Sequence, residues 1–195
     1  AMGSIEMSLS NNRMVAETMA RGVEAVQRQA VKGEQTASDW DAAAYQEILT
    51  SFVGSNPETF GGGIWFEPYQ YRPEQRYFSP YCMRQNGAVT YVDNYSLGEG
   101  VYYTDQDWYT NAANTTQKSV WSAPYYDEFA QISMVTSSAP IYDETGRFLG
   151  VATADIDLTQ MQQMVLSLDV VANGRAFLID DTGVYIADED SEKLL

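Results

Sequence analysis

The sequence predicts an α+β fold in which helices pack against one antiparallel sheet. Apolar residues recur at helical spacing in the first part of the chain and in strand-like runs from about residue 64 onward. Asn86-Gly87, between two such runs, is the strongest short hairpin signal in the chain. With 195 residues, 45% of them hydrophobic, the chain is long enough for one packed domain and part of a second.

The first predicted element is a long amphipathic helix over residues 5–33, and Lys32-Gly33 is a plausible C-terminal stop. Its apolar stripe consists of Val15, Met19, Val23, Val26 and Ala30. At 1.5 Å per residue the helix would be roughly 40 Å long, which exceeds most globular helices. Two interpretations stay open: a helix that covers the core, and a stalk over residues 1–35 that leaves the domain.

The next elements follow in order along the chain. A second helix is expected to begin at Ser38 or Asp39 and to end at Phe52. The glycines at 61–63 predict a break before a strand at 64–66. The other predicted elements are strands at 77–83 and 88–91, a helix from Asp105 to Thr115, strands at 120–126, 131–139 and 148–155, a turn at 143–146, and a helix at 158–168.

The last part of the chain predicts a new unit. Strands at 176–179 and 184–187 flank an Asp-Asp-Thr-Gly turn. A lone hairpin of this kind has only marginal stability unless it joins a sheet. We therefore expect one module over residues 36–168 and the incomplete beginning of a second over 169–195. The opening Ala-Met-Gly-Ser resembles a cloning remnant, so we expect the sequence to be a piece of a longer protein.

Composition excludes several classes of function. The absence of histidine removes histidine acid–base catalysis, catalytic triads and the commonest zinc and haem ligands. A net charge of −16 disfavours nucleic acid and anionic membranes as partners. Cys82 is the single cysteine and cannot form an intrachain disulfide, and no apolar run approaches the ~18 residues of a membrane span. We expect no cofactor and no metal.

Carboxylates and aromatic residues gather in three segments, 102–112, 121–129 and 150–158. Acidic pairs such as Asp127/Glu128 are typical of solvated strand sides, so a hydrolase is the least favoured function. Asp155 differs, because it follows the apolar run Val-Ala-Thr-Ala. A carboxylate inside the fold must be hydrogen-bonded, paired or waiting for a cation, and Arg147 is the only basic residue between Lys118 and Arg175.

The order of these motifs resembles that of double-Cache, PAS-like sensor domains. The motifs are "GIWFEPY", "YYTDQDWYTNA", "WSAPYYDEF", "ISMVTSSAPIYDETGRFLGVATADIDL" and "GRAFLIDDTGVYIA". Such domains lie outside the membrane in bacterial and archaeal chemoreceptors, histidine kinases and diguanylate cyclases. The resemblance implies a non-enzymatic, periplasmic or extracellular ligand-binding module on a long N-terminal helix, with membrane spans outside these 195 residues.

Members of that family that bind amino acids use a tyrosine, an arginine, a Trp-Tyr pair, a Tyr-x-Asp and a later aspartate. Trp108 and Tyr109 match the Trp-Tyr pair, and Asp155 matches the later aspartate. The matches to Tyr-x-Asp are Tyr125 and Asp127. The arginine position falls on Gln106 and the leading tyrosine position on Val101, although Tyr102 or Tyr103 would substitute if the loop shifts.

The resemblance therefore implies that the residues for a ligand ammonium group are present, whereas the arginine for a ligand carboxylate is replaced by Gln106. We expect a small amine or ammonium ligand, walled by Trp108, Tyr109 and Tyr125 and neutralised by Asp127 and Asp155. One alternative is a sensor of amino acids or other carboxylates that uses Gln106 and backbone N–H groups. Another is a ligand-free spacer or dimerisation module, and a homodimer through the N-terminal helix is a further expectation.

Overall fold

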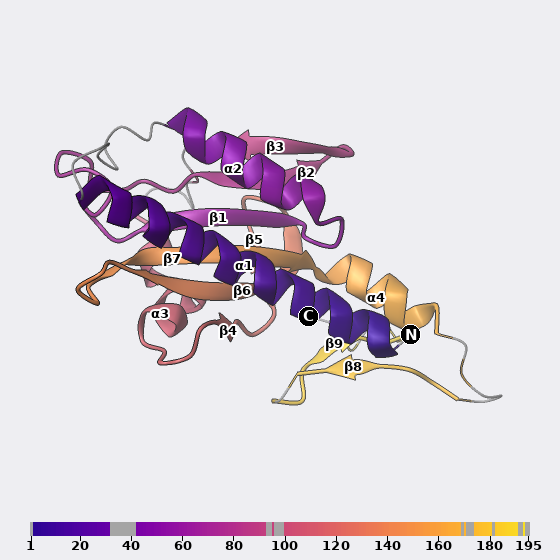
Figure 1. The fold of residues 1–195 in the computed structure, drawn as a ribbon. Helices are drawn as coiled ribbons and strands as arrows, with labels where there is room; N and C mark the ends of the chain where they lie inside the picture. The colour runs from indigo at the N-terminus through magenta and orange to yellow at the C-terminus, as the bar shows by residue number, and fades with distance from the viewer. Residues whose placement is uncertain are drawn as a thin grey trace.

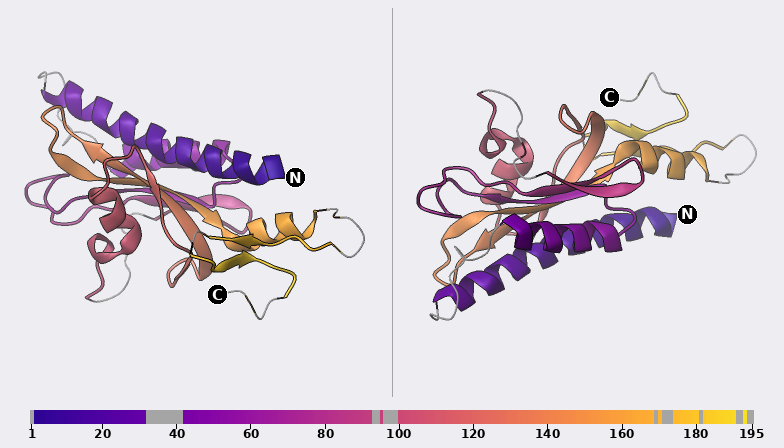
Figure 2. Two further views of the ribbon diagram at one scale, coloured as in Figure 1. Left: turned by 90° about the horizontal axis from the view of Figure 1, so that it is seen from below. Right: turned by 90° about the horizontal axis from the view of Figure 1, so that it is seen from above.

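The chain folds around one antiparallel sheet with helices on both faces (Figures 1 and 2). The computed structural model describes residues 2–31, 42–92, 95, 100–168, 170, 174–180, 182–190 and 193. The seven-stranded sheet has the order β3-β2-β1-β7-β6-β4, and β5 also pairs with β6. Helices α1 (Met2–Val31) and α2 (Ala42–Ser55) cover one face, and α3 (Asp107–Ala113) lies on the other. The predicted α+β class is confirmed.

The predicted N-terminal helix is present as α1, although its predicted stop at Lys32-Gly33 lies outside the described residues. Ala16, Met19 and Ala20 are buried against the sheet. Near the N-terminus, Ile5 packs against Val165 and Ala187 from the C-terminal part of the chain. The described helix therefore packs along its length, and a stalk function remains a prediction.

Helix α2 buries Tyr45, Leu49 and Val53 in the same core, while Ile48 and Phe52 are only partly buried. Its predicted start at Ser38 or Asp39 lies outside the described residues, and its end is Ser55 rather than Phe52. Arg84 satisfies one carbonyl of the last helical turn and two that follow it, because its guanidinium donates to the oxygens of Val53, Asn56 and Thr59 at 2.6, 3.0 and 3.0 Å.

The predicted break at the glycines is wrong, because β1 (Gly61–Phe66) includes all three of them. A Cβ atom on Gly61 would lie 2.0 Å from the Tyr81 hydroxyl oxygen. A Cβ atom on Gly63 would lie 2.9 Å from both the Tyr81 and the Trp65 rings. These glycines are therefore strand positions that make room for aromatic rings rather than a turn.

The hairpin prediction is confirmed. Strands β2 (Tyr81–Gln85) and β3 (Ala88–Val92) pair antiparallel on either side of Asn86-Gly87. Both turn residues have positive φ, 51° and 80°, as a type I′ turn requires. The strand begins at Tyr81 and not at residue 77, directly after Pro80, which cannot donate to a sheet ladder.

Two predicted elements between residues 103 and 127 are divided. The predicted helix consists of a 3₁₀ turn, η2 (Tyr103–Asp105), and α3, so Gln106 and not Asp105 occupies the N-cap position of α3. The predicted strand at 120–126 is two short strands, β4 (Val120–Trp121) and β5 (Tyr125–Asp127), with Pro124 between them. Both short strands pair with β6.

The two longest strands form the centre of the sheet. These are β6 (Ile132–Tyr142) and β7 (Phe148–Asp157), joined by the predicted turn at 143–146. Helix α4 (Leu158–Leu166) follows, and the side chain of Asp157 caps it by accepting from the backbone N–H of Thr159 at 2.8 Å.

The C-terminal part forms a separate hairpin of β8 (Leu178–Ile179) and β9 (Tyr185–Ala187). Whether residues 169–195 begin a second module, as the sequence predicts, stays a prediction. In the part of the chain that the structure describes, none of the helices is long and apolar enough to cross a membrane.

Candidate ligand-binding site

The strand register collects the site on the sheet face opposite α1 and α2. Thr136 of β6 lies directly opposite Asp155 of β7, and Gly61 of β1 pairs with Asp155 on its other side. Because alternate residues of a strand share a face, Thr153 and Met134 lie on this same face. The intervening residues, such as Ala154, face the helices. Five strands, β1, β2, β5, β6 and β7, thus place polar and aromatic side chains together.

Tyr81 and Trp65 reach the site because glycines leave space above β1. The Tyr81 ring crosses Gly61 and Gly63, and its hydroxyl donates to Asp155 Oδ2 at 2.7 Å. The Trp65 indole donates through Nε1 to Thr153 Oγ1 at 2.8 Å. A strand with side chains at 61 and 63 could not hold the Tyr81 ring in this position.

Asp155 is a buried carboxylate, 3% exposed. Oδ1 accepts from Thr136 Oγ1 at 2.8 Å, and Oδ2 accepts from Tyr81. Burial raises the pKa of Asp155 from 3.8 to about 7, the bonds from Tyr81 and Thr136 oppose that rise, and the charge of Asp127 adds to it. The protonated and ionised forms of Asp155 therefore have similar populations at neutral pH.

Asp127, at the end of β5, is the second buried carboxylate, 6% exposed. Tyr95 donates to Oδ2 at 2.5 Å, and the backbone N–H of Ala130 donates to Oδ1 at 2.6 Å. Among the described residues, neither Asp127 nor Asp155 has a lysine or arginine within ion-pair distance. Two acids thus share a buried region, and neither has a basic partner in the part of the chain that the structure describes.

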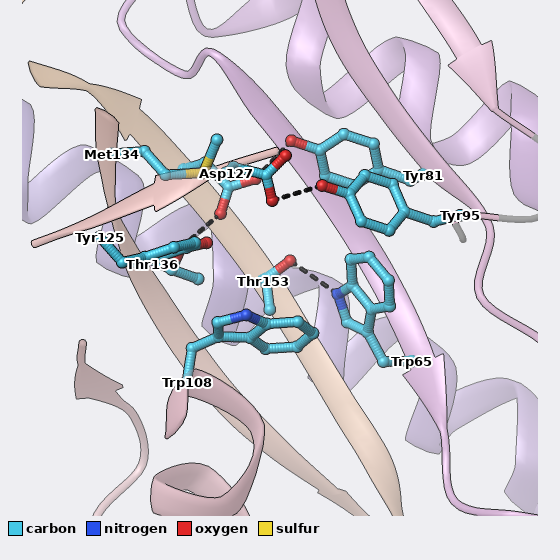
Figure 3. Close-up of a pocket in the computed structure, with 10 residues that line it drawn as sticks. Trp65, Tyr81, Tyr95, Trp108, Tyr125, Asp127, Met134, Thr136 and Thr153 are labelled. Atoms are coloured by element: carbon cyan, nitrogen blue, oxygen red, sulfur yellow. Dashed lines mark hydrogen bonds between the residues drawn. The ribbon is translucent and has the colours of Figure 1, made fainter. Parts of the chain in front are cut away.

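Aromatic rings enclose these carboxylates (Figure 3). The residues that line the cavity are Trp65, Tyr81, Tyr95, Trp108, Tyr125, Asp127, Met134, Thr136, Thr153 and Asp155. Its volume of about 10 Å³ is room for about one water molecule. Any larger ligand must therefore displace side chains to enter.

A second pocket of about 290 Å³ lies next to this cavity and shares two walls with it, Trp108 and Tyr125. We call it the outer pocket. It is also lined by residues 105–107 and 122–126. The outer pocket and the cavity with the buried carboxylates are therefore neighbours at these two side chains.

The structure brings together four of the six predicted site residues: Trp108, Tyr125, Asp127 and Asp155 line the cavity. Gln106 lines the outer pocket instead, and its side chain donates to the Tyr102 carbonyl at 3.4 Å. Tyr109 is buried beside Trp108, and its hydroxyl donates to Glu67 at 2.7 Å. The binding role of each of the six stays a proposal.

Sequence reasoning missed several lining residues: Trp65, Tyr81, Tyr95, Met134, Thr136 and Thr153. The available signal was the alternation of side chains between the two faces of a strand. Trp65 lies in the strand-like segment "GIWFEPY", and Tyr81 follows a proline at the start of another strand. Alternation assigns such residues to a face, but only the pairing of β1 with both β2 and β7 shows that these faces meet at Asp155.

The described residues contain no group of three or more histidine, cysteine, aspartate or glutamate side chains that could hold a metal ion. What they offer is negative charge at two carboxylates, aromatic faces and hydroxyl groups. That combination suits a small organic cation, because ring faces and carboxylates both attract positive charge.

Comparison with known proteins agrees with this architecture. A family model described as "Methyl-accepting chemotaxis protein-like, first PDC sensor domain" matches residues 45–163, a range that includes the whole cavity. Methyl-accepting chemotaxis protein McpC of Bacillus subtilis (strain 168) is 38% identical over 84 residues, which are 43% of this chain and 13% of McpC. In the curated relatives that it matches, the chain spans only 13%, 29% and 21% of the full length.

Solved structures show the same fold. The extracellular domain of soHK1S-Z6, described as a histidine kinase, has a TM-score of 0.62 and 27% identity, over 97% of this chain and 74% of that one. The ligand-binding domain of the Campylobacter jejuni chemoreceptor Tlp3 with L-valine has a TM-score of 0.69 and 17% identity, over 97% and 67%. The expected sensor-domain character and extracytoplasmic location are confirmed. The chain belongs to the family of methyl-accepting chemotaxis protein-like first PDC sensor domains.

Proposed function

We propose that this sensor domain detects a small amine or ammonium compound in the cavity beside α3. One observation carries the proposal: two buried carboxylates, Asp127 and Asp155, share an aromatic cavity and have no basic partner among the described residues. An ionised carboxylate is costly to bury without a counter-charge. A bound cation supplies that counter-charge, so the site gains more from a cation than from a neutral or anionic ligand.

The surroundings of the outer pocket also disfavour an anion. Gln106 stands at the position where the amino-acid-binding pattern has arginine, and it lies between the exposed acids Asp105 and Asp107. A charged hydrogen bond contributes about 1.5–3 kcal/mol. Because the arginine is absent, a ligand carboxylate would not gain this contribution here. The same carboxylate would meet two negative charges, whose repulsion solvent only partly screens.

An amino-acid sensor is the second candidate. Tlp3, which shares the fold, was solved with L-valine, and the PctC ligand-binding domain of Pseudomonas aeruginosa PAO1 with GABA. The observation that favours this candidate is the position of Gln106, which lines the outer pocket. Its side-chain amide can donate a hydrogen bond to a carboxylate. Valine and GABA both carry an ammonium group, so the two candidates share the inner half of the site and differ at the outer half.

Calorimetric titration with paired ligands separates the candidates. Ethylamine and glycine, or butylamine and GABA, differ chiefly in the carboxylate. The proposal expects the amine of each pair to bind more tightly, and Asp127→Asn to weaken amine binding by about tenfold or more, as loss of one charged contact implies. Glu128→Gln is the matched control, because it removes the same charge from the exposed neighbouring position and should leave affinity unchanged. Binding by the carboxylate-bearing partners alone would contradict the amine proposal.

The output of the receptor lies outside this chain. We propose that ligand entry changes the packing between the site and α1 and that the change passes through a membrane span to a kinase, cyclase or chemotaxis signalling module. In this proposal the domain itself performs no catalysis.

A further inference from the structure

The buried cavity has the features of an aromatic cage. Five rings line it, those of Trp65, Tyr81, Tyr95, Trp108 and Tyr125. Trp65 contacts Trp108 at a centroid distance of 4.8 Å with 56° between the ring planes, and Tyr95 at 5.1 Å with 85°. The rings of these three residues therefore face different directions (Figure 3). Among the described residues, the cation–π contacts involve other rings, at Tyr71, Tyr77, Tyr102, Phe177 and Tyr185.

The polar atoms of the cavity are already bonded to one another. Each of the four carboxylate oxygens of Asp127 and Asp155 accepts one hydrogen bond, from Tyr95, Ala130, Tyr81 or Thr136. Thr153 Oγ1 accepts from Trp65, and the hydroxyls of Tyr125 and Thr136 bond each other at 2.8 Å. A primary ammonium brings three N–H donors, and each must find an acceptor when it leaves water, here the second lone pair of an oxygen that already accepts one bond.

We infer that the cavity selects a methylated, and most strongly a quaternary, ammonium group over a primary one. This inference rests on the proposed amine-sensing function and narrows its ligand class. A quaternary ammonium has no N–H donor to satisfy, so the existing hydrogen bonds can persist around it. Its charge is spread over methyl groups, which pack on ring faces while the two carboxylates supply the opposite charge. Space for it requires Trp108 or Tyr125 to move toward the outer pocket.

A methylation series at constant charge tests the inference. The probes are the chlorides of methylammonium, dimethylammonium, trimethylammonium and tetramethylammonium, titrated into the intact domain by calorimetry at pH 8. Each added methyl group is expected to raise affinity by about fourfold, since one buried methylene-sized group contributes about that factor. Affinity that stays level or falls with methylation would overturn the inference and leave the amine proposal standing. Failure of all four probes to bind would overturn both.

Charge and apolar size are separated by choline and 3,3-dimethylbutan-1-ol, which have the same shape but differ in the central atom and its charge. The alcohol is expected to bind at least about tenfold more weakly, because it has no charge for the rings and carboxylates to attract. Equal affinity for the two probes would overturn the inference, since the cavity would then recognise apolar bulk alone.

Tyr125 offers a substitution pair that tests the ring itself, because it is only partly buried and its replacement is less disruptive than that of Trp65. Tyr125→Phe keeps the ring and removes the hydroxyl, so it is the reference against which loss of the ring is measured with tetramethylammonium. Tyr125→Leu removes the ring, and affinity should fall by about tenfold. Circular dichroism should first show that both variants are folded. A Leu variant that binds as well as the Phe variant would show that the ring face contributes nothing, contrary to the inference.

Discussion

At the scale of single residues, Asp155 decides how ligand binding should depend on pH. Its pKa of about 7 is raised chiefly because burial disfavours the charged form. A cation in the cavity favours that charged form, so it lowers the pKa, and binding at pH 7 should release a proton. Affinity should therefore be highest above pH 7 and fall by up to about tenfold per pH unit below it.

Calorimetry measures this linkage directly. Trimethylammonium titrations at pH 6 and pH 8, each in two buffers of different ionisation enthalpy, give both the affinity and the number of protons released. Asp155→Asn cannot lose a proton at this position, so it should bind weakly and show little difference between the two pH values. The same affinity at pH 6 and pH 8 in the unchanged protein would contradict a role for Asp155 as the titrating group.

Both acids of the site and two of its five rings, Trp108 and Tyr125, could be predicted from the sequence, but the other three rings could not. Asp155 follows a run of apolar residues, which marks it as buried whatever the sheet looks like. Trp65 and Tyr81 carry no such local sign, because an aromatic residue on a strand is ordinarily part of a core. They belong to the site only through the cross-strand register that sets Gly61 between Asp155 and Met83. Tyr95 reaches Asp127 from a position 32 residues away.

At the scale of elements, β1 explains why the sequence contains three consecutive glycines. Gly61→Ala would place a Cβ atom 2.0 Å from the Tyr81 hydroxyl oxygen and 2.6 Å from its ring carbon. The ring must then shift away from Asp155, and we expect a loss of about 1–3 kcal/mol in the free energy of unfolding together with weaker ligand binding. Denaturant unfolding and calorimetry on the same sample measure the two effects.

Gly54→Ala provides the matched control for this prediction. Gly54 lies in α2 with nothing within 4 Å of an added Cβ, so the substitution should be neutral or raise stability by up to about 1 kcal/mol. If Gly61→Ala unfolds at the same denaturant concentration as the unchanged protein and binds equally well, the glycines are not needed to position Tyr81.

Elements with a strong local signal could be predicted, while those that depend on neighbouring strands could not. The periodicity of α1 and the Asn86-Gly87 turn act within one segment, and both are confirmed. The glycines at 61–63 resemble a turn in isolation, and only the ring of Tyr81 on the adjacent strand makes them strand residues. The division of 120–126 into β4 and β5 likewise depends on how each part pairs with β6.

At the scale of the whole molecule, a short chain of contacts joins the site to α1. The backbone N–H of Phe60 donates to the Asp155 carbonyl at 2.8 Å, and the preceding residue, Thr59, donates through its hydroxyl to Asn12 of α1 at 2.8 Å. Asn12 and Thr59 are both fully buried. A buried polar pair holds one geometry more strictly than an apolar contact does, so a shift of β7 at Asp155 would be felt by α1 at this point.

The double variant Asn12→Leu/Thr59→Val tests this coupling, because it replaces both polar partners with apolar side chains and leaves neither one unsatisfied. Ligand affinity should stay within about threefold, since neither residue lines the cavity. In the unchanged protein, ligand should alter amide hydrogen exchange around residues 8–16 of α1, whereas in the double variant that change should shrink by at least about half. Glu17→Gln is the control, because it affects a different contact of α1, the one with Ser119. If the exchange response is equally large in the double variant, the signal reaches α1 by another route. The remaining physical connection is then the broad packing of α1 against β6 and β7.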